Sequence, residues 1–196
     1  CVIVTTSAEN WSMEELSSVS IDDEKAGETI VDYLIEHGHT KIAEIGANLE
    51  LSQTAILRHN GYLNSLKKHG ITPDERYYER ARFSYDSAYR AMKKLLEKDI
   101  EITAVYAISD VMAIGAIRAI LDKGLRVPED ISITGFDGST LAEYYNPKIV
   151  SIRQPHKDMA ARSVELLFNM IDLHKGSCHE IIPFELTEGE SVARID

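Results

Sequence analysis

Four side chains whose chemistry suits a small polar molecule stand near the expected ends of strands. Arg58 offers a guanidinium donor, Asp137 a carboxylate acceptor, Ser109 a hydroxyl group and Phe83 an aromatic face. Sugars need this combination, because their hydroxyls donate and accept hydrogen bonds and their ring C–H groups lie against aromatic rings. We therefore interpret these four residues as candidate ligand contacts.

Each candidate also has an ordinary structural interpretation. An arginine on a helix is more often solvated, Asp137 suits a turn before Gly138 as well as it suits a ligand, and Phe83 could belong to the core. Asp110, which follows Ser109, is more typical of a cap on the helix that begins at the next residue. The shared position of these residues at one sheet edge favours the binding interpretation.

Motifs of catalysis and cofactor binding are missing from the sequence. It contains no G-x-x-x-x-G-K-[ST], G-x-G-x-x-G, G-x-S-x-G or H-E-x-x-H pattern, and its seven histidines show no metal-ligand spacing. The acidic run 22–24 could hold Mg²⁺, but it is more typical of a helix start, where carboxylates complement the helix dipole. We expect a binding protein that is not an enzyme and uses no cofactor and no metal.

The composition also limits which partners the chain can bind. There are 32 acidic against 21 basic residues, and the net charge of -11 repels a phosphate backbone. The two cysteines, Cys1 and Cys178, imply no disulfide framework, and no apolar run approaches the roughly 20 residues that span a bilayer. We expect a cytoplasmic protein with no membrane association, in which this chain by itself does not hold DNA.

Strand-like and helix-like segments alternate along the whole chain, and this alternation positions the candidates. Apolar, β-branched runs predict strands at 2–5, 42–45, 104–108, 131–136, 149–152 and 181–186, and a further strand that ends at Arg82-Phe83. Helical periodicity and caps predict helices at 24–37, 54–69 and 112–123, a short one near 141–145 and one carrying Ala88, Met92 and Leu95. A long amphipathic helix is predicted to start at Pro155, with Met159, Val164, Leu167, Phe168 and Ile171 on its apolar side. Such alternation predicts doubly wound parallel sheets, in which ligands bind beyond the carboxyl ends of the strands.

Several motifs resemble the lac repressor/galactose repressor family of transcription regulators. They are AISDVMAIGA at 107–116, GLRVPEDISI at 124–133, GFD at 135–137, IRQP at 152–155, YLIEHGH at 33–39, and Arg58 with Gly61-Tyr62. The resemblance implies a periplasmic-binding-protein-like fold of two parallel-sheet subdomains. Residues 23–152 with 184–196 would form the C-terminal subdomain, and residues 1–22 with 153–183 the remaining part of an incomplete N-terminal one. The helix-turn-helix DNA-binding domain would precede Cys1.

The resemblance also implies roles for single residues. Arg58 matches an arginine that grips the effector, Asp137 an aspartate that accepts from hydroxyls, and Phe83 an aromatic residue of the pocket. Ser109 stands where many sugar-responsive members have another polar residue. Gln154 and His156 would line the hinge side of the cleft. A dimer interface would contain Ala88, Ile114, Ile117, Arg118, Tyr144 and Tyr145.

The expected function is therefore the effector-binding and dimerisation core of a bacterial transcription repressor. It would sense a small molecule, most simply a sugar, and reach operator DNA only through the missing N-terminal domain. The alternative is a solute-binding protein of a sugar transporter with the same fold. A helix-turn-helix ahead of Cys1 would distinguish the two.

Overall fold

The computed structural model describes residues 1–5, 16–172 and 177–195. The chain divides into two compact units. The smaller contains Cys1–Asp23 and Gln154–Glu185, and the larger contains Glu24–Arg153 and Leu186–Asp196. These divisions fall one or two residues after the predicted ones. The assignment of the units as parts of N-terminal and C-terminal subdomains stays a prediction.

The larger unit is built on a six-stranded sheet with the strand order β4-β3-β5-β6-β7-β9. The strands are β3 (Ile42–Gly46), β4 (Tyr78–Arg80), β5 (Ala104–Ala107), β6 (Ser132–Asp137), β7 (Val150–Arg153) and β9 (Glu185–Thr187). The pairs β3–β4, β3–β5, β5–β6 and β6–β7 are parallel. All residues of β3 and β5 are buried, including Glu44 of β3, as is usual for strands covered on both faces.

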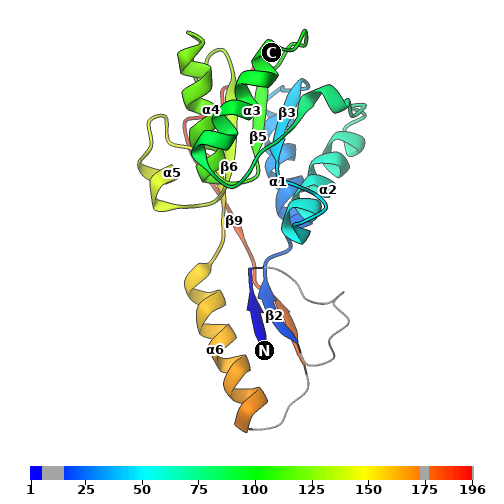
Figure 1. The fold of residues 1–196 in the computed structure, drawn as a ribbon, viewed down its shortest axis with the longest axis vertical. Coiled ribbons are helices and arrows are strands. Elements are labelled where there is room, and N and C mark those ends of the chain that lie inside the picture. The colour runs from blue at the N-terminus through cyan, green and yellow to red at the C-terminus, as the bar shows by residue number, and fades with distance from the viewer. Residues whose placement is uncertain (6–15, 173–176, 196) are drawn as a thin grey trace. The chain divides into compact units, whose positions relative to one another are not determined.

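Helices cover both faces of this sheet (Figure 1). They are α1 (Asp23–Glu36), α2 (Gln53–Lys68), α3 (Tyr85–Glu97), α4 (Asp110–Asp122) and the short α5 (Thr140–Tyr144), with a 3-10 turn η1 at Glu75–Tyr77. Figure 1 shows α1 and α2 on one side of the sheet, and α3 and α4 on the other. The residues Ala88, Met92 and Leu95 of α3 are buried. The predicted α/β class with a doubly wound parallel sheet is confirmed.

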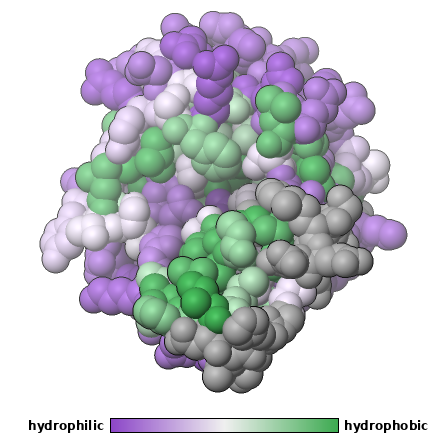
Figure 2. Space-filling model, turned by 60° about the horizontal axis from the view of Figure 1, so that its bottom comes forward, coloured by the Kyte–Doolittle hydropathy of each residue, from purple (hydrophilic) through white to green (hydrophobic). Residues whose placement is uncertain are grey.

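The smaller unit has a three-stranded parallel sheet and one long helix. The sheet order is β1-β2-β8, from β1 (Val2–Val4), β2 (Ser17–Ser20) and β8 (His179–Ile181), and the helix is α6 (His156–Asp172). Although β1 was expected to be buried, Val4 is exposed. Figure 2 turns this end of the molecule forward and shows hydrophobic surface gathered on it.

The apolar side of α6 is largely exposed. Met159 is buried, but Val164, Leu167, Phe168 and Ile171 are exposed. Among the described residues, α6 packs mainly against β1 and β2 and pairs with β8 through Arg162 and Glu180, and so narrow a sheet covers only one stripe of the helix.

Two predicted strands have different bounds in the structure. The strand expected to end at Arg82-Phe83 stops at Arg80, so Phe83 lies in the bend before α3. The single strand expected at 181–186 is two strands, β8 and β9, in different sheets. Pro183 lies between them, and because proline has no backbone N–H it interrupts a strand ladder.

No helix in the described ranges is both long enough and apolar enough to cross a membrane.

Candidate functional site

The strand order places a crevice at one point of the sheet edge. From β3 the chain passes outward to β4, then crosses back to β5 on the opposite side of β3. The connections after β3 and β5 therefore leave in opposite directions. Beyond the carboxyl ends of such diverging strands, open α/β sheets bind their ligands.

Arg58 reaches this point from α2 and is not solvated. Its side chain is only 4% exposed, and its Nη1 donates to the carbonyl oxygen of Ile108, the residue after β5, over 2.6 Å. Its guanidinium carbon lies 3.5 Å from the ring centroid of Phe136, a cation–π contact. Packing and hydrogen bonding thus hold the guanidinium at the carboxyl ends of β5 and β6.

Asp137, the last residue of β6, meets Arg58 there. Its Oδ1 lies 3.6 Å from Arg58 Nη1, and its side chain is 33% exposed, so solvent and ligand can reach the carboxylate. The backbone at Asp137 has a φ of 106°, a conformation that residues with a side chain rarely adopt. The structure thus brings together the two candidates that the sequence placed 79 positions apart.

A buried carboxylate holds the turn that carries Asp137. Asp110 accepts a hydrogen bond from Ser151 Oγ at 2.7 Å and another from the backbone N–H of Ser139 at 2.6 Å. The N–H of Gly138 donates to Ser151 Oγ at 3.1 Å. Burial raises the pKa of Asp110, although the hydrogen bonds from Ser151 and Ser139 oppose this. Asp110 is therefore a positioning residue for the turn.

Ser109 has a structural role that the sequence interpretation assigned to its neighbour. Its side chain is buried and accepts from the N–H of Met112, which makes Ser109 the N-cap of α4. Asp110 is the first helical residue, so the prediction that Asp110 caps this helix is wrong by one position. The hydroxyl of Ser109 thus accepts in a helix cap and keeps its own hydrogen to donate. Its contribution to ligand binding stays a prediction.

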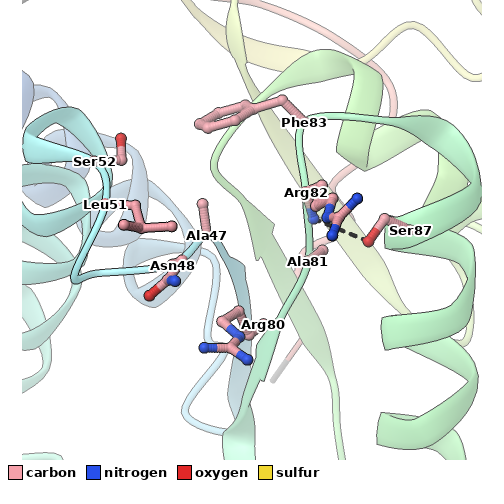
Figure 3. Close-up of a pocket in the computed structure, with 9 residues that line it drawn as sticks. All are labelled: Ala47, Asn48, Leu51, Ser52, Arg80, Ala81, Arg82, Phe83 and Ser87. Atoms are coloured by element: carbon pink, nitrogen blue, oxygen red, sulfur yellow. Dashed lines mark hydrogen bonds between the residues drawn. The ribbon is translucent and has the colours of Figure 1, made fainter.

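Phe83 belongs to a separate pocket at the same edge of the sheet. This pocket has a volume of about 420 Å³, and Phe83 is 50% exposed, so it is not a core residue. Figure 3 shows residues from the segment after β4 facing residues from the segment after β3. The lining residues are Ala47, Asn48, Leu51, Ser52, Arg80, Ala81, Arg82, Phe83 and Ser87.

Sequence reasoning missed the polar lining of this pocket. Asn48 and Ser52 follow β3, Ser52 is also the N-cap of α2, and Arg80 is the last residue of β4. These positions obey the same carboxyl-end rule that selected Asp137. Arg80 was overlooked because the predicted strand ended three residues too late, at Phe83. Asn48 and Ser52 were overlooked because only Arg58 was selected from the segment that follows β3.

Gln154 and His156 lie in the smaller unit. Gln154 is buried directly after β7, and His156 is an exposed residue at the start of α6. The N–H of His156 donates to the carbonyl oxygen of Gln154 at 2.9 Å. Their contribution to ligand binding stays a prediction.

Two of the six predicted dimer residues cannot face a partner. Ala88 and Ile117 are fully buried, because α3 and α4 pack against each other. Ile114 is half-buried, and Arg118 is exposed. On α5, Tyr144 is 82% exposed, and the adjacent Tyr145 is half-buried.

In the described part of the chain, no group of three or more His, Cys, Asp or Glu side chains could hold a metal ion. The site thus consists of an ion pair at the switch point of a parallel sheet and an open polar pocket with an aromatic wall. Fold and site together define a small-molecule-binding α/β domain.

Comparison with known proteins identifies its family. Residues 31–192 match the periplasmic binding protein-like domain. The transcriptional regulator MalR of Clostridium butyricum is 41% identical over 179 residues, which cover 91% of this chain and 53% of that protein. The chain thus spans about half the length of this curated relative.

Two solved structures extend the likeness to the fold. A complex of the transcriptional regulator CelR with cellobiose aligns with a TM-score of 0.90 at 32% identity and covers 97% of this chain and 58% of that one. A regulator from Enterococcus faecium with bound ribose aligns with a TM-score of 0.89 at 26% identity and covers 100% and 71%. The chain belongs to the periplasmic-binding-protein-like family, among the lac repressor/galactose repressor regulators.

Proposed function

We propose that this chain is the effector-binding and dimerisation core of a transcription repressor whose effector is a sugar. The observation that carries the proposal is the pairing of Arg58 and Asp137 at the switch point of the sheet. A carboxylate and a guanidinium side by side accept from and donate to neighbouring hydroxyls of one sugar ring. Phe83, at the same sheet edge, offers a face for the ring C–H groups.

The similar proteins support a sugar as the effector and transcription regulation as the function. The similar structures hold cellobiose and ribose, and the similar MalR is named a transcriptional regulator. The protein would bind its effector in the cytoplasm and catalyse no reaction on it. It would act on operator DNA through a domain outside this chain, because a net charge of -11 opposes direct contact with phosphates.

Self-association is the second part of the proposal. The helix α4 presents Ile114, Arg118 and Leu121 at helical spacing on its outer side, and the neighbouring α5 presents Leu141 and Tyr144. A two-fold axis would bring two copies of this surface together, the common route to a homodimer.

A thermal-shift screen of the intact protein tests the proposed effector. The panel contains glucose, maltose, cellobiose and ribose, their phosphate esters, and purine bases. A ligand at 100 times its dissociation constant stabilises the folded state by about 2.7 kcal/mol, a readily measured shift. A sugar or sugar ester that shifts the melting temperature supports the proposal. Stabilisation by a purine alone, or by no member, would contradict it.

The same ligands separate the repressor from a transport protein. With the sugar absent, the intact repressor retards a DNA fragment from its own promoter region, and the sugar changes that retardation. A protein that binds sugar yet retards no such DNA fragment would support the transporter alternative.

A further inference from the structure

Two arginines line the pocket of Phe83 without neutralising partners. Arg80 and Arg82 both border this pocket and are exposed. Within the described residues neither guanidinium makes a hydrogen bond or an ion pair. The one contact of this kind at Arg82 comes from its backbone N–H, which donates to Ser87 Oγ at 2.9 Å. None of the nine lining residues is acidic.

This is unusual in an acidic chain, where most other arginines have acceptors. Arg76 pairs with Asp74, Arg118 with Asp122, Arg126 with Asp130, Arg153 with Glu143 and Arg162 with Glu180. Arg90 on α3 also lacks an ion pair among the described residues, but it lies outside the pocket. Two unneutralised guanidiniums in one cavity therefore create a local positive field in a chain of net charge -11.

The strand geometry explains why both arginines border one cavity. The N–H of Ala81 donates to the carbonyl oxygen of Gly46, so the pairing with β3 continues one residue past β4. Arg80 and Arg82 stand on either side of this last paired residue, and both border the pocket. In Figure 3, Arg80 and Phe83 extend toward the side of Asn48 and Ser52, and Arg82 lies between them along the chain, next to Ser87.

We infer that the effector carries an anionic group, a phosphate or a carboxylate, which Arg80 and Arg82 bind. Guanidinium groups make paired, charge-assisted hydrogen bonds with either anion. Asn48 and Ser52 supply neutral polar groups across the pocket, and Phe83 supplies an aromatic face for the sugar ring. The expected ligand class is thus a sugar phosphate or a sugar acid. This inference rests on the proposed function and narrows it.

Calorimetric titration of the intact protein tests the charge of the ligand. The probes are glucose, maltose, cellobiose and ribose, each beside its terminal phosphate ester, with glucuronate as the carboxylate and inorganic phosphate as the bare anion. At least one anionic sugar should bind tenfold or more tightly than its neutral parent, and its affinity should fall as salt rises. The phosphate esters and glucuronate distinguish the two anionic groups.

Matched variants locate the anion. Arg80→Gln and Arg82→Gln should each weaken the anionic sugar about tenfold and leave the affinity for its neutral parent unchanged. Arg90→Gln, which removes a similarly exposed arginine outside the pocket, should change neither affinity.

Four outcomes would overturn the inference. If a neutral sugar binds as tightly as its ester, or if both pocket variants keep full affinity for the ester, the inferred binding of an anionic group by this pocket is wrong. The proposed sugar-sensing function would still stand. If inorganic phosphate binds as tightly as any sugar ester, the ligand is not a sugar derivative. If no sugar, neutral or anionic, binds at all, the proposed function itself fails.

Discussion

At the scale of single residues, Asp137 combines an exposed carboxylate with a strained backbone. A φ of 106° at a residue with a side chain costs on the order of 1–3 kcal/mol. The surrounding hydrogen bonds of Asp110, Ser139 and Ser151 fix the turn despite this cost. Such strain is kept where it places a functional group, and here it directs the carboxylate toward Arg58.

Substituting the carboxylate tests its role in binding. Asp137→Asn should weaken effector binding about tenfold to a hundredfold, because each charge-assisted hydrogen bond contributes roughly 1.5–3 kcal/mol and 1.4 kcal/mol is a factor of ten. Asparagine tolerates positive φ, and Arg58 keeps its bond to the Ile108 carbonyl, so the free energy of unfolding should change by about 1 kcal/mol or less.

Calorimetric titration and a melting curve of the same preparation measure both quantities. Asp130→Asn serves as the control, because Asp130 pairs with Arg126 on the surface and should not affect the effector. Full affinity combined with a strongly lowered melting temperature would show that Asp137 serves the turn alone.

At the scale of elements, Arg58 depends on the contact between α1 and α2. A Cβ on Gly61 would lie 2.3 Å from the carbonyl oxygen of Glu24 and 2.6 Å from the backbone nitrogen of Glu28. Both atoms are backbone, so neither can move without moving α1. Glycine therefore allows α2 to approach closely, three positions along the helix from Arg58.

A single methyl group should separate these helices. Gly61→Ala should lower the free energy of unfolding by about 1–3 kcal/mol through overpacking, and it should also weaken effector binding, because α2 carries Arg58. Denaturant titration and calorimetry measure the two effects. Lys67→Ala, on the exposed side of α2, is the control. A Gly61→Ala variant with unchanged stability would contradict the close packing.

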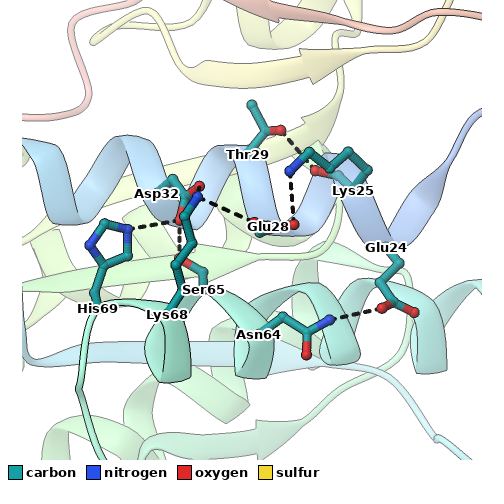
Figure 4. Close-up of polar contacts among 9 residues, drawn as sticks. All are labelled: Glu24, Lys25, Glu28, Thr29, Asp32, Asn64, Ser65, Lys68 and His69. Atoms are coloured by element: carbon teal, nitrogen blue, oxygen red, sulfur yellow. Dashed lines mark hydrogen bonds and ion pairs between the residues drawn. The ribbon is translucent and has the colours of Figure 1, made fainter.

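Polar side chains join the same two helices (Figure 4). Asp32 on α1 accepts from Ser65 Oγ at 2.7 Å, from Lys68 Nζ at 2.6 Å and from His69 Nε2 at 3.1 Å. Burial by itself would raise the pKa of Asp32, but the hydrogen bonds from Lys68 and Ser65 and the charge of Lys68 hold this pKa below its ordinary value of 3.8.

The lowered pKa of Asp32 predicts an acid-dependent contribution to stability. A carboxyl group whose pKa is depressed by folding stabilises the native state above its unfolded pKa, and this stabilisation is lost as the pH falls through the folded pKa. Asp32→Asn should therefore be about 1–2 kcal/mol less stable than the parent protein at pH 7, and the difference should shrink below pH 3.8. Urea titrations from pH 7 to pH 2.5 measure it. A gap that stays constant to pH 2.5 would contradict the assignment.

At the scale of the whole molecule, we propose that two copies associate through the outer surface of α4 and α5. Of the predicted interface residues, Ala88 and Ile117 are inside the protein, whereas Tyr144 is exposed. Leu121 and Leu141, which were not among the predicted residues, are also exposed. The proposed interface thus moves outward from the packed side of α4 to its opposite side.

Sedimentation analysis of the intact protein tests this surface. The parent protein should be a dimer at micromolar concentration, and Tyr144→Glu should shift it toward monomer, because two unpaired carboxylates would be buried near the symmetry axis. Lys67→Glu on α2 changes the charge elsewhere and should leave the dimer intact. A dimer that survives Tyr144→Glu together with Leu121→Glu would place the interface on another surface.

The sequence by itself determined the alternating α/β architecture and the sheet edge at which the candidates lie. Hydrophobic periodicity and turn glycines are local properties, so they define strands and helices without knowledge of the fold. The carboxyl-end rule then selects Asp137 and places Arg58 in the helix that follows another strand of the same sheet.

Only the tertiary structure decided what each side chain does there. Whether Arg58 is solvated depends on Ile108 and Phe136, which lie 50 and 78 positions away in the chain. Ser109 caps α4 and does not line the pocket of Phe83. Arg80 and Arg82 border this pocket, because β4 ends at Arg80 and not at Phe83. Exposure and partner distances arise from packing between segments remote in sequence, which local patterns do not encode.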